Sequence, residues 1–193
     1  MAEFNPLCPT PFSTDGKITL AHGSGGIPSA ELVSKLFVPA LKNKYLELLH
    51  DGAVFELGNS RLAFTTDSFV VKPIFFPGGD IGSLSVHGTV NDLAMCGARP
   101  LMLSLSFIIE EGFPMADLAR IVKSISNACK GADVMVVTGD TKVVEKDNAD
   151  GIFINTTGVG TVEYEGISPK TVRPGDSIIL NGAIGLHGIA VMV

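Results

Sequence analysis

The spacing of apolar residues along the chain predicts several amphipathic helices. Apolar residues recur at steps of three and four over residues 29–49, which predicts a helix that Pro39 should break or kink. A second helix is predicted over residues 81–96, with Asp80 in a suitable place to cap its N-terminus. A third is predicted over residues 114–130.

Runs rich in β-branched and other apolar residues predict strands between these helices. Helices that follow pairs of strands in this way indicate an α+β fold rather than a regular alternation of single strands and helices. The predicted strands cover residues 54–57, 61–65, 101–109, 134–138 and 151–162, and residues 177–180 begin a further element.

Composition narrows the class of protein. The length of 193 residues allows one domain or one and a fraction, and the net charge of −6 argues against nucleic acid as a partner. Only 18% of the residues are charged, below the usual quarter or so. The apolar excess predicts either a buried sheet or a large apolar surface that a partner subunit covers.

Cysteine use and the start of the chain predict a cytoplasmic location. The three cysteines show no paired spacing, which favours a reducing compartment over a disulfide framework or a zinc site. The first residues lack the basic and apolar regions of a signal peptide. No apolar run approaches the roughly 18–20 residues of a membrane span.

Four aspartates stand at positions that favour a metal site. Asp67 and Asp140 each directly follow a predicted strand, Asp51 opens one, and Asp92 lies near the end of a predicted helix, where its charge is unfavourable. Carboxylate oxygens favour Mg²⁺ over zinc. Magnesium together with a glycine-rich loop at residues 22–26 suggests phosphate chemistry, in which Lys142 would neutralise a phosphate or activate a group. Each aspartate taken alone is also typical of a turn or a cap.

The usual nucleotide motifs are absent from the sequence. No G-x-x-x-x-G-K-[ST] run occurs, and "HGSGG" at residues 22–26 lacks the third glycine of a dinucleotide fingerprint. This glycine-rich segment is as typical of a plain linker as of a flexible cover over phosphates.

Several longer motifs resemble one superfamily. "TTD", "NDLAMCGA" and "GDTK" are similar to motifs shared across the aminoimidazole ribonucleotide synthetase-like (PurM-like) superfamily. "AHGSGG" and "FFPGGDIG" resemble more narrowly the HypE family of hydrogenase maturation proteins, which are carbamoyl dehydratases. The resemblance runs from about Leu20 to the end of the chain.

The resemblance implies a fold and a domain division. It implies a PurM-like α+β N-terminal domain, in which helices cover one face of a mixed or antiparallel sheet and the sheet pairs across a homodimer into a β-barrel. Residues 1–17 would be a flexible arm, residues 18–170 the ATP-binding and dimerisation domain, and residues 171–193 the truncated start of a C-terminal domain.

The resemblance also implies ATP and Mg²⁺ as cofactors and a set of site residues. Lys142 would be the catalytic residue and would also contact the nucleotide. The implied metal ligands are Asp51, Asp67, Asp92 and Asp140, and the implied nucleotide contacts are these four with Asn91, Gly139, Thr141 and Lys142.

In the HypE family, a HypF-like carbamoyltransferase loads a cysteine at the extreme C-terminus. ATP then drives dehydration of the S-carbamoyl group to thiocyanate, and a HypC-HypD-like scaffold complex receives the cyanide for the iron of [NiFe]-hydrogenase. This sequence has no cysteine after Cys129, so we expect an N-terminal fragment that is inactive by itself.

Two other interpretations stay open at this point. The first is another ATP-dependent PurM-like enzyme, such as a thiamine-monophosphate kinase or a selenophosphate synthetase. A selenophosphate synthetase should carry a reactive cysteine or selenocysteine in its glycine-rich segment, and "HGSGG" has neither. The second is a non-catalytic module for dimerisation and docking.

Overall fold

The computed structural model describes residues 16–192 and divides the chain into two compact units, Met1–Leu49 and His50–Val193. Most of the predicted arm over residues 1–17 lies outside the described residues. The predicted domain boundary at residues 170 and 171 stays a prediction.

The first unit is helical, but its helix is shorter than the apolar spacing predicts. The helix begins at Ile27 and ends at Ala40, so the prediction that it continues to residue 49 is wrong. Pro39 lies in the first turn of the last helical segment, directly after a π-helical turn. A π turn displaces the backbone hydrogen bonds by one residue, which accommodates the missing N–H of proline. The segments are η1 Leu20–Gly23, α1 Ile27–Leu32, η2 Val33–Phe37, α2 Val38–Ala40 and η3 Leu46–Leu48.

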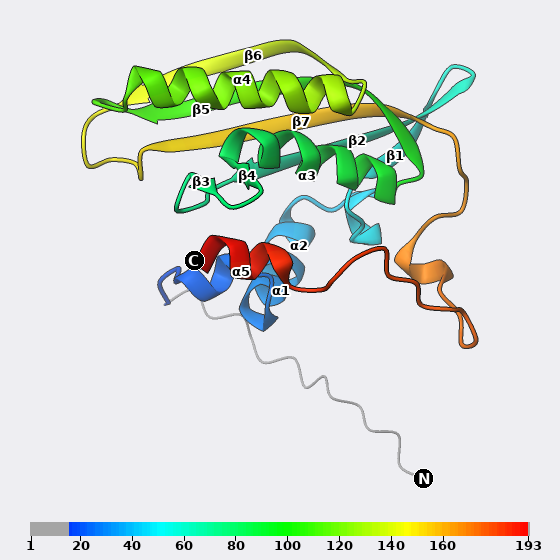
Figure 1. Ribbon diagram of the computed structural model, residues 1–193. Helices are drawn as coiled ribbons and strands as arrows, with labels where there is room; N and C mark the ends of the chain where they lie inside the picture. Colours follow the sequence, from blue (N-terminus) through cyan, green and yellow to red (C-terminus); the bar gives the residue numbers. More distant parts are fainter. Residues whose placement is uncertain (1–15, 193) are drawn as a thin grey trace. The chain divides into compact units, whose positions relative to one another are not determined.

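The second unit contains a five-stranded mixed sheet in the order β1-β2-β7-β5-β6 (Figure 1). Every neighbouring pair is antiparallel except β5 and β6, which are parallel and are joined through helix α4, as a parallel pair requires. The strands are β1 Ala53–Leu57, β2 Ser60–Phe69, β5 Ala98–Glu110, β6 Met135–Val144 and β7 Ile152–Val162, with a small ribbon of β3 Phe75–Phe76 and β4 Gly79–Asp80.

Helices α3 (Ile81–Met95) and α4 (Met115–Gly131) run side by side on one face of this sheet (Figure 1). Strand β7 shows the arrangement directly, because its residues alternate between buried and partly buried from Ile152 to Thr161. We call the buried side the helix face. The core between sheet and helices includes Leu103, Ile109, Ile152 and Ile154 from the strands with Val86, Ile121 and Ile125 from the helices.

The start of α3 is built as the sequence predicts. The Asp80 side chain accepts a hydrogen bond from the Ser83 amide at 2.9 Å, and the Ser83 hydroxyl lies 3.1 Å from the Asp80 amide, which completes a capping box. Gly82 then packs against α4 so closely that a Cβ atom there would lie 2.7 Å from the Ile121 carbonyl oxygen. The cap and the glycine together fix where α3 begins and how closely it approaches α4.

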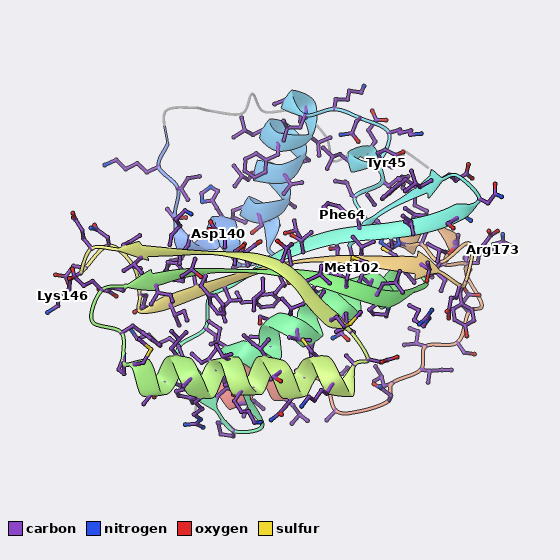
Figure 2. All side chains as sticks on the ribbon, turned by 90° about the horizontal axis from the view of Figure 1, so that it is seen from above. Tyr45, Phe64, Met102, Asp140, Lys146 and Arg173 are labelled. Atoms are coloured by element: carbon purple, nitrogen blue, oxygen red, sulfur yellow. The ribbon has the colours of Figure 1, made fainter. Side chains whose placement is uncertain are left out.

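The opposite side of the sheet, which we call the open face, is not covered by α3 or α4. Apolar side chains there are partly exposed: Phe64, Met102 and Ile108 are between 39% and 44% exposed. Phe64 and Met102 are both register partners of Val159, so they lie in one row across three strands. Figure 2 labels Phe64, Met102 and Asp140, which belong to three different strands of this face.

Two strands continue further than their apolar runs predict. Strand β2 reaches Phe69 and β6 reaches Val144, so the prediction that Asp67 and Asp140 follow the ends of strands is wrong. Both residues lie within strands, because β7 and β5 supply register partners past the apolar runs. A polar sequence such as "GDTK" is compatible with a strand when a neighbouring backbone provides the hydrogen bonds.

The last part of the chain also differs from the prediction. Residues 177–180 form no strand, and Ile178 and Ile179 are exposed. They are followed by the short helix α5 (Leu186–Met192), and η4 (Pro169–Thr171) precedes them. The predicted α+β class, with a mixed sheet and helices on one face, is confirmed.

Candidate nucleotide and metal site

Asp92 lies in surroundings that disfavour its charged form. It lies near the C-terminal end of α3 and is partly buried, next to the unfavourable end of the helix dipole. Burial raises the pKa of Asp92; the hydrogen bond from Thr65 lowers that pKa, and the charges of Asp67 and Asp51 raise it further. The net pKa shift is upward, so the surroundings of Asp92 disfavour its charged form.

Thr65 connects Asp92 to the segment that carries Asp51. It lies on β2, is only 4% exposed, and has its hydroxyl oxygen 3.0 Å from Oδ2 of Asp92. The same hydroxyl lies 2.7 Å from the backbone carbonyl oxygen of Asp51. One buried side chain therefore contacts both of these predicted site residues.

Asp67 lies on the same side of β2 as Thr65, because the two residues are two positions apart in a strand. Its register partner on β7 is Thr156, which is fully buried and donates a hydrogen bond to the Ser85 carbonyl of α3. A Cβ atom at Gly88 of α3 would lie 3.5 Å from Oδ2 of Asp67 and 2.6 Å from the Phe69 ring. The absence of a side chain at Gly88 therefore leaves room for the Asp67 carboxylate on the helix face.

His50 holds Asp51 from the other side. The Asp51 amide donates to Nδ1 of His50 at 2.8 Å, so the neutral imidazole carries its proton on Nε2, which lies 3.3 Å from the Ile167 carbonyl oxygen. The thiol of Cys96 is 3.8 Å from the same Nδ1. Burial raises the pKa of the Cys96 thiol, and the charges of Asp51 and Asp92 raise it further, so the thiol stays protonated.

A pocket of about 350 Å³ opens beside Asp51. His50, Asp51 and Met95 line it together with residues of the 166–172 loop. The Asp51 side chain is half exposed. The group formed by Asp51, Asp67 and Asp92, which we call the helix-face carboxylates, is therefore accessible from solvent on the side of Asp51.

Asp140 lies on the other side of the sheet. Its register partner is Ser106, which pairs with Asn155, which in turn pairs with Ser68. Because Ser68 is adjacent to Asp67 in the same strand, the Asp140 row and Asp67 face opposite ways. The sequence interpretation assigns all four aspartates to one metal site, whereas the structure gathers three and leaves the fourth on the open face.

The charge of Asp140 is already balanced. The Lys142 ammonium lies 2.7 and 2.9 Å from the two carboxylate oxygens, and both side chains are exposed. The hydrogen bond from Lys142 and the Thr141 amide lower the pKa of Asp140, the opposite direction to Asp92. Lys142, the residue that the family resemblance implies to be catalytic, is thus paired on the open face.

The remaining predicted contacts lie near these two groups. Asn91 is exposed on α3, next to Asp92. Thr141 is exposed on β6 beside Asp140. Gly139 is required by packing, because a Cβ atom there would lie 2.1 Å from the Leu105 carbonyl oxygen.

Sequence reasoning did not single out Thr65 or His50 as site residues. Thr65 is part of the motif "TTD", and His50 directly precedes Asp51, so adjacency is the only signal for either. Their contacts depend on tertiary structure: Thr65 meets Asp92 across 27 positions, and His50 meets Ile167 across 117.

The helix-face carboxylates offer the oxygen donors that Mg²⁺ prefers. Within residues 16–192, no group of three or more His, Cys, Asp and Glu side chains is arranged to hold a metal ion. Mg²⁺ does not require such a group, since proteins usually bind it through one or two carboxylates, with phosphate oxygens and water completing the shell.

Residues 49–162 match the family described as AIR synthase related protein, N-terminal domain. The chain belongs to this family. The match covers the whole sheet, both helices and the helix-face carboxylates. None of the helices that the structure describes is long and apolar enough to cross a bilayer.

Within the AIR synthase related family, the chain is similar to hydrogenase maturation proteins. It is 54% identical over 179 residues to the carbamoyl dehydratase HypE of Azotobacter vinelandii, which covers 92% of this chain and 52% of the relative. The chain spans about half the length of the curated relatives it matches.

Solved structures agree with this placement. HypE in a HypE–HypF complex matches with a TM-score of 0.78 and 52% identity, over 83% of this chain and 52% of that one. HypE in complex with ATP matches with a TM-score of 0.53 and 52% identity, over 76% of this chain and 43% of that one. A thiamine monophosphate kinase from Aquifex aeolicus is only 20% identical, with a TM-score of 0.52 over 65% of this chain and 40% of that one, and shares the fold alone.

Proposed function

We propose that the chain is the N-terminal, ATP-binding portion of a HypE-type carbamoyl dehydratase. The observation that carries the proposal is the group of helix-face carboxylates, in which burial and the charges of Asp67 and Asp51 raise the pKa of Asp92. That group occurs in a chain 54% identical to a carbamoyl dehydratase over 92% of its length. A site with surplus negative charge favours a ligand that brings a divalent cation.

The proposed reaction removes water from a carbamoyl group attached to a cysteine sulfur. The carbamoyl oxygen attacks the γ-phosphorus of ATP, ADP leaves, and an O-phosphorylated intermediate forms. Loss of the N–H protons and departure of phosphate break the carbon–oxygen bond and leave a thiocyanate, R–S–C≡N. Phosphorylation is needed because an amide oxygen is a poor leaving group and phosphate is a good one.

We assign the helix-face carboxylates to the magnesium of Mg·ATP. When bound, the cation neutralises charge on the transferred phosphoryl group. One or two of Asp51, Asp67 and Asp92 would hold the cation, with phosphate oxygens and water as its other ligands. Thr65 and His50 fix the residues that carry two of these carboxylates.

We also assign Asp140 and Lys142 to the nucleotide, with Asn91, Gly139 and Thr141 beside them. Strand β6 is at the end of the sheet, and nearly all of its residues are exposed. Strand β6 is therefore accessible to a phosphate group from solvent. Lys142 would exchange its contact with Asp140 for phosphate oxygens, and in this way it would serve as the catalytic cation.

The open face supports a homodimer. Its apolar side chains come from adjacent strands, and pairing two such faces would bury them in a barrel between the copies. A HypF-like carbamoyltransferase and a HypC-HypD-like scaffold complex are the further partners, in the cytoplasm, with the iron of [NiFe]-hydrogenase as the destination of the cyanide.

Isothermal titration of the 193-residue chain with ATP, with and without Mg²⁺, tests the proposal. We expect binding that requires Mg²⁺ and that ADP competes away. A chain with no heat of binding and no competition would instead be a docking module, and the proposal would be wrong.

We further propose that the chain alone does not form thiocyanate. Cys96 and Cys129 are buried, and burial raises the pKa of each thiol, so neither is available to accept a carbamoyl group. Cys8 lies outside the described residues. Thiocyanate production by the purified chain from a carbamoyl donor and ATP would contradict this part of the proposal.

A further inference from the structure

We propose that Thr65 is a positioning residue: its buried hydroxyl sets the distance between the Asp51 segment and the Asp92 carboxylate, and thereby the affinity of the site for Mg²⁺. This inference rests on the proposed function, because it assigns a cation to the helix-face carboxylates. It adds a residue that supports the site without contacting the cation.

The geometry gives one hydroxyl two acceptors. Oγ1 of Thr65 lies 2.7 Å from the Asp51 carbonyl oxygen and 3.0 Å from Oδ2 of Asp92. A threonine hydroxyl carries a single proton, so the two oxygens share it. Both acceptors must stay close to the same hydroxyl to be satisfied, which fixes their separation.

Asp92 needs this restraint because its neighbours repel it. The charges of Asp67 and Asp51 both act on Asp92. The Asp92 side chain is only partly buried, so without the hydroxyl it is free to rotate toward water, away from the other two carboxylates. The Thr65 hydrogen bond favours the charged form of Asp92 against burial and repulsion.

The Asp51 segment is held on both sides. Its amide donates to His50 and its carbonyl accepts from Thr65. The next residue, Gly52, has no spare room, because a Cβ atom there would lie 2.9 Å from the Cys96 sulfur and 3.0 Å from the Phe64 carbonyl oxygen. The segment is closely packed, and the Thr65 hydroxyl is one of the contacts that hold it. Loss of this hydroxyl would loosen the segment at Asp51.

A purely structural role is the competing explanation, and the chain offers a matched control. Thr89 on α3 is also fully buried and shares a hydrogen bond with the Thr156 hydroxyl, but neither contacts a carboxylate. Thr65→Val and Thr89→Val remove the same atom from two buried threonines. Thr65→Ser keeps the hydroxyl and loses only a methyl group.

Amide hydrogen exchange of the ligand-free chain is the first test. We expect Thr65→Val to accelerate exchange at Asp51 and Gly52 by about threefold to tenfold, the effect of one lost hydrogen bond. Thr65→Ser should stay at the wild-type rate, and Thr89→Val should leave these two amides unchanged. Unchanged exchange at Asp51 and Gly52 in Thr65→Val would overturn the inference.

The second test is the Mg²⁺ concentration that half-saturates ATP binding, measured by calorimetry. Residues that orient metal ligands typically change metal affinity by about 10–100-fold, so we expect a rise of that size in Thr65→Val, recovery in Thr65→Ser and no change in Thr89→Val. Equal shifts in Thr65→Val and Thr89→Val would show a structural effect only and would overturn the inference. If the wild-type chain binds no Mg·ATP, the proposed function fails, while the exchange rates still decide whether Thr65 restrains Asp51.

Discussion

The two faces of the same sheet place their carboxylates in opposite electrostatic surroundings. On the helix face, Asp92 is partly buried, near two other carboxylates, with its pKa raised. On the open face, Asp140 is exposed and bound to Lys142, with its pKa lowered. Both aspartates belong to motifs that resemble the same superfamily, and the fold gives them opposite surroundings.

This difference indicates which face requires a ligand. A salt-bridged, exposed aspartate is stable as it stands, whereas a group of like charges in a partly buried place is tolerated when something else compensates. A bound cation should therefore stabilise the folded chain more on the helix face than on the open face. In the absence of a ligand, removing a charge from the open face should change the stability least.

Asp92→Asn gives the largest expected effect and tests the helix face. We expect Mg·ATP affinity to fall by about 100-fold or more, since a direct carboxylate ligand is lost where charge is needed most. Calorimetry measures the affinity, and circular dichroism checks that the fold is intact. Wild-type affinity in Asp92→Asn would remove this residue from the metal set.

Phe64→Glu tests the open face as an association surface. A charge within the apolar row should prevent two such faces from packing, so we expect a dimer of the 20.2 kDa chain to become a monomer on sizing chromatography. Val122→Glu, on the exposed side of α4, is the matched control and should remain dimeric. A wild-type chain that is already monomeric at all concentrations would contradict the proposed homodimer.

Lys142→Ala tests whether the two faces serve the same nucleotide. We expect Mg·ATP affinity to fall about tenfold, more at low ionic strength than at high, because an exposed cation acts through screened charge. Lys123→Ala on α4 removes another exposed lysine and should have no effect. If Lys142→Ala binds Mg·ATP as the wild type does, the open-face pair is not part of the nucleotide site.

The smallest effect concerns stability and its dependence on pH. Without ligand, Asp92→Asn should raise the melting temperature at neutral pH by about 1–4 °C, because it removes an unfavourable charge from the end of a helix. The folded-state pKa of Asp92 is raised, so the wild type loses stability as the pH rises through that pKa. The gain in melting temperature from Asp92→Asn should therefore disappear at pH values below the ordinary carboxyl pKa, where Asp92 is protonated.

Asp140→Asn should behave in the opposite sense. Its folded-state pKa is lowered, so its contribution to stability is present above the ordinary carboxyl pKa and is lost as the pH falls through the lowered one. We expect a small decrease in melting temperature at neutral pH. Thermal unfolding of both variants at two pH values checks the signs, and shifts of the same sign would contradict the contrast between the faces.

Local signals in the sequence predicted much of the fold. Helix α3 begins at its predicted cap, because the Asp80 capping box is a contact between near neighbours in the chain. The motif resemblance identified the family and the α+β class. The lengths of β2 and β6 were not predictable, since their polar ends are held as strands by β7 and β5, which come from distant parts of the chain.

The candidate site was predicted only in part, for the same reason. Their positions in the sequence predicted Asp67 and Asp140 as site residues. The face of the sheet on which each side chain lies depends on the strand register, and register is set by pairing between strands. Thr65 and His50 act through contacts to residues remote in sequence, so no local pattern identifies them.

The position of β6 at the end of the sheet has a consequence for solubility. An outermost strand exposes backbone groups that another chain is able to extend by β-pairing, and such edges lead to aggregation unless charges oppose the pairing. Asp140 and Lys142 place an ion pair in the middle of this strand. An incoming strand would have to accommodate both charges, so the same pair that we assign to the nucleotide also opposes fibrous growth along this edge.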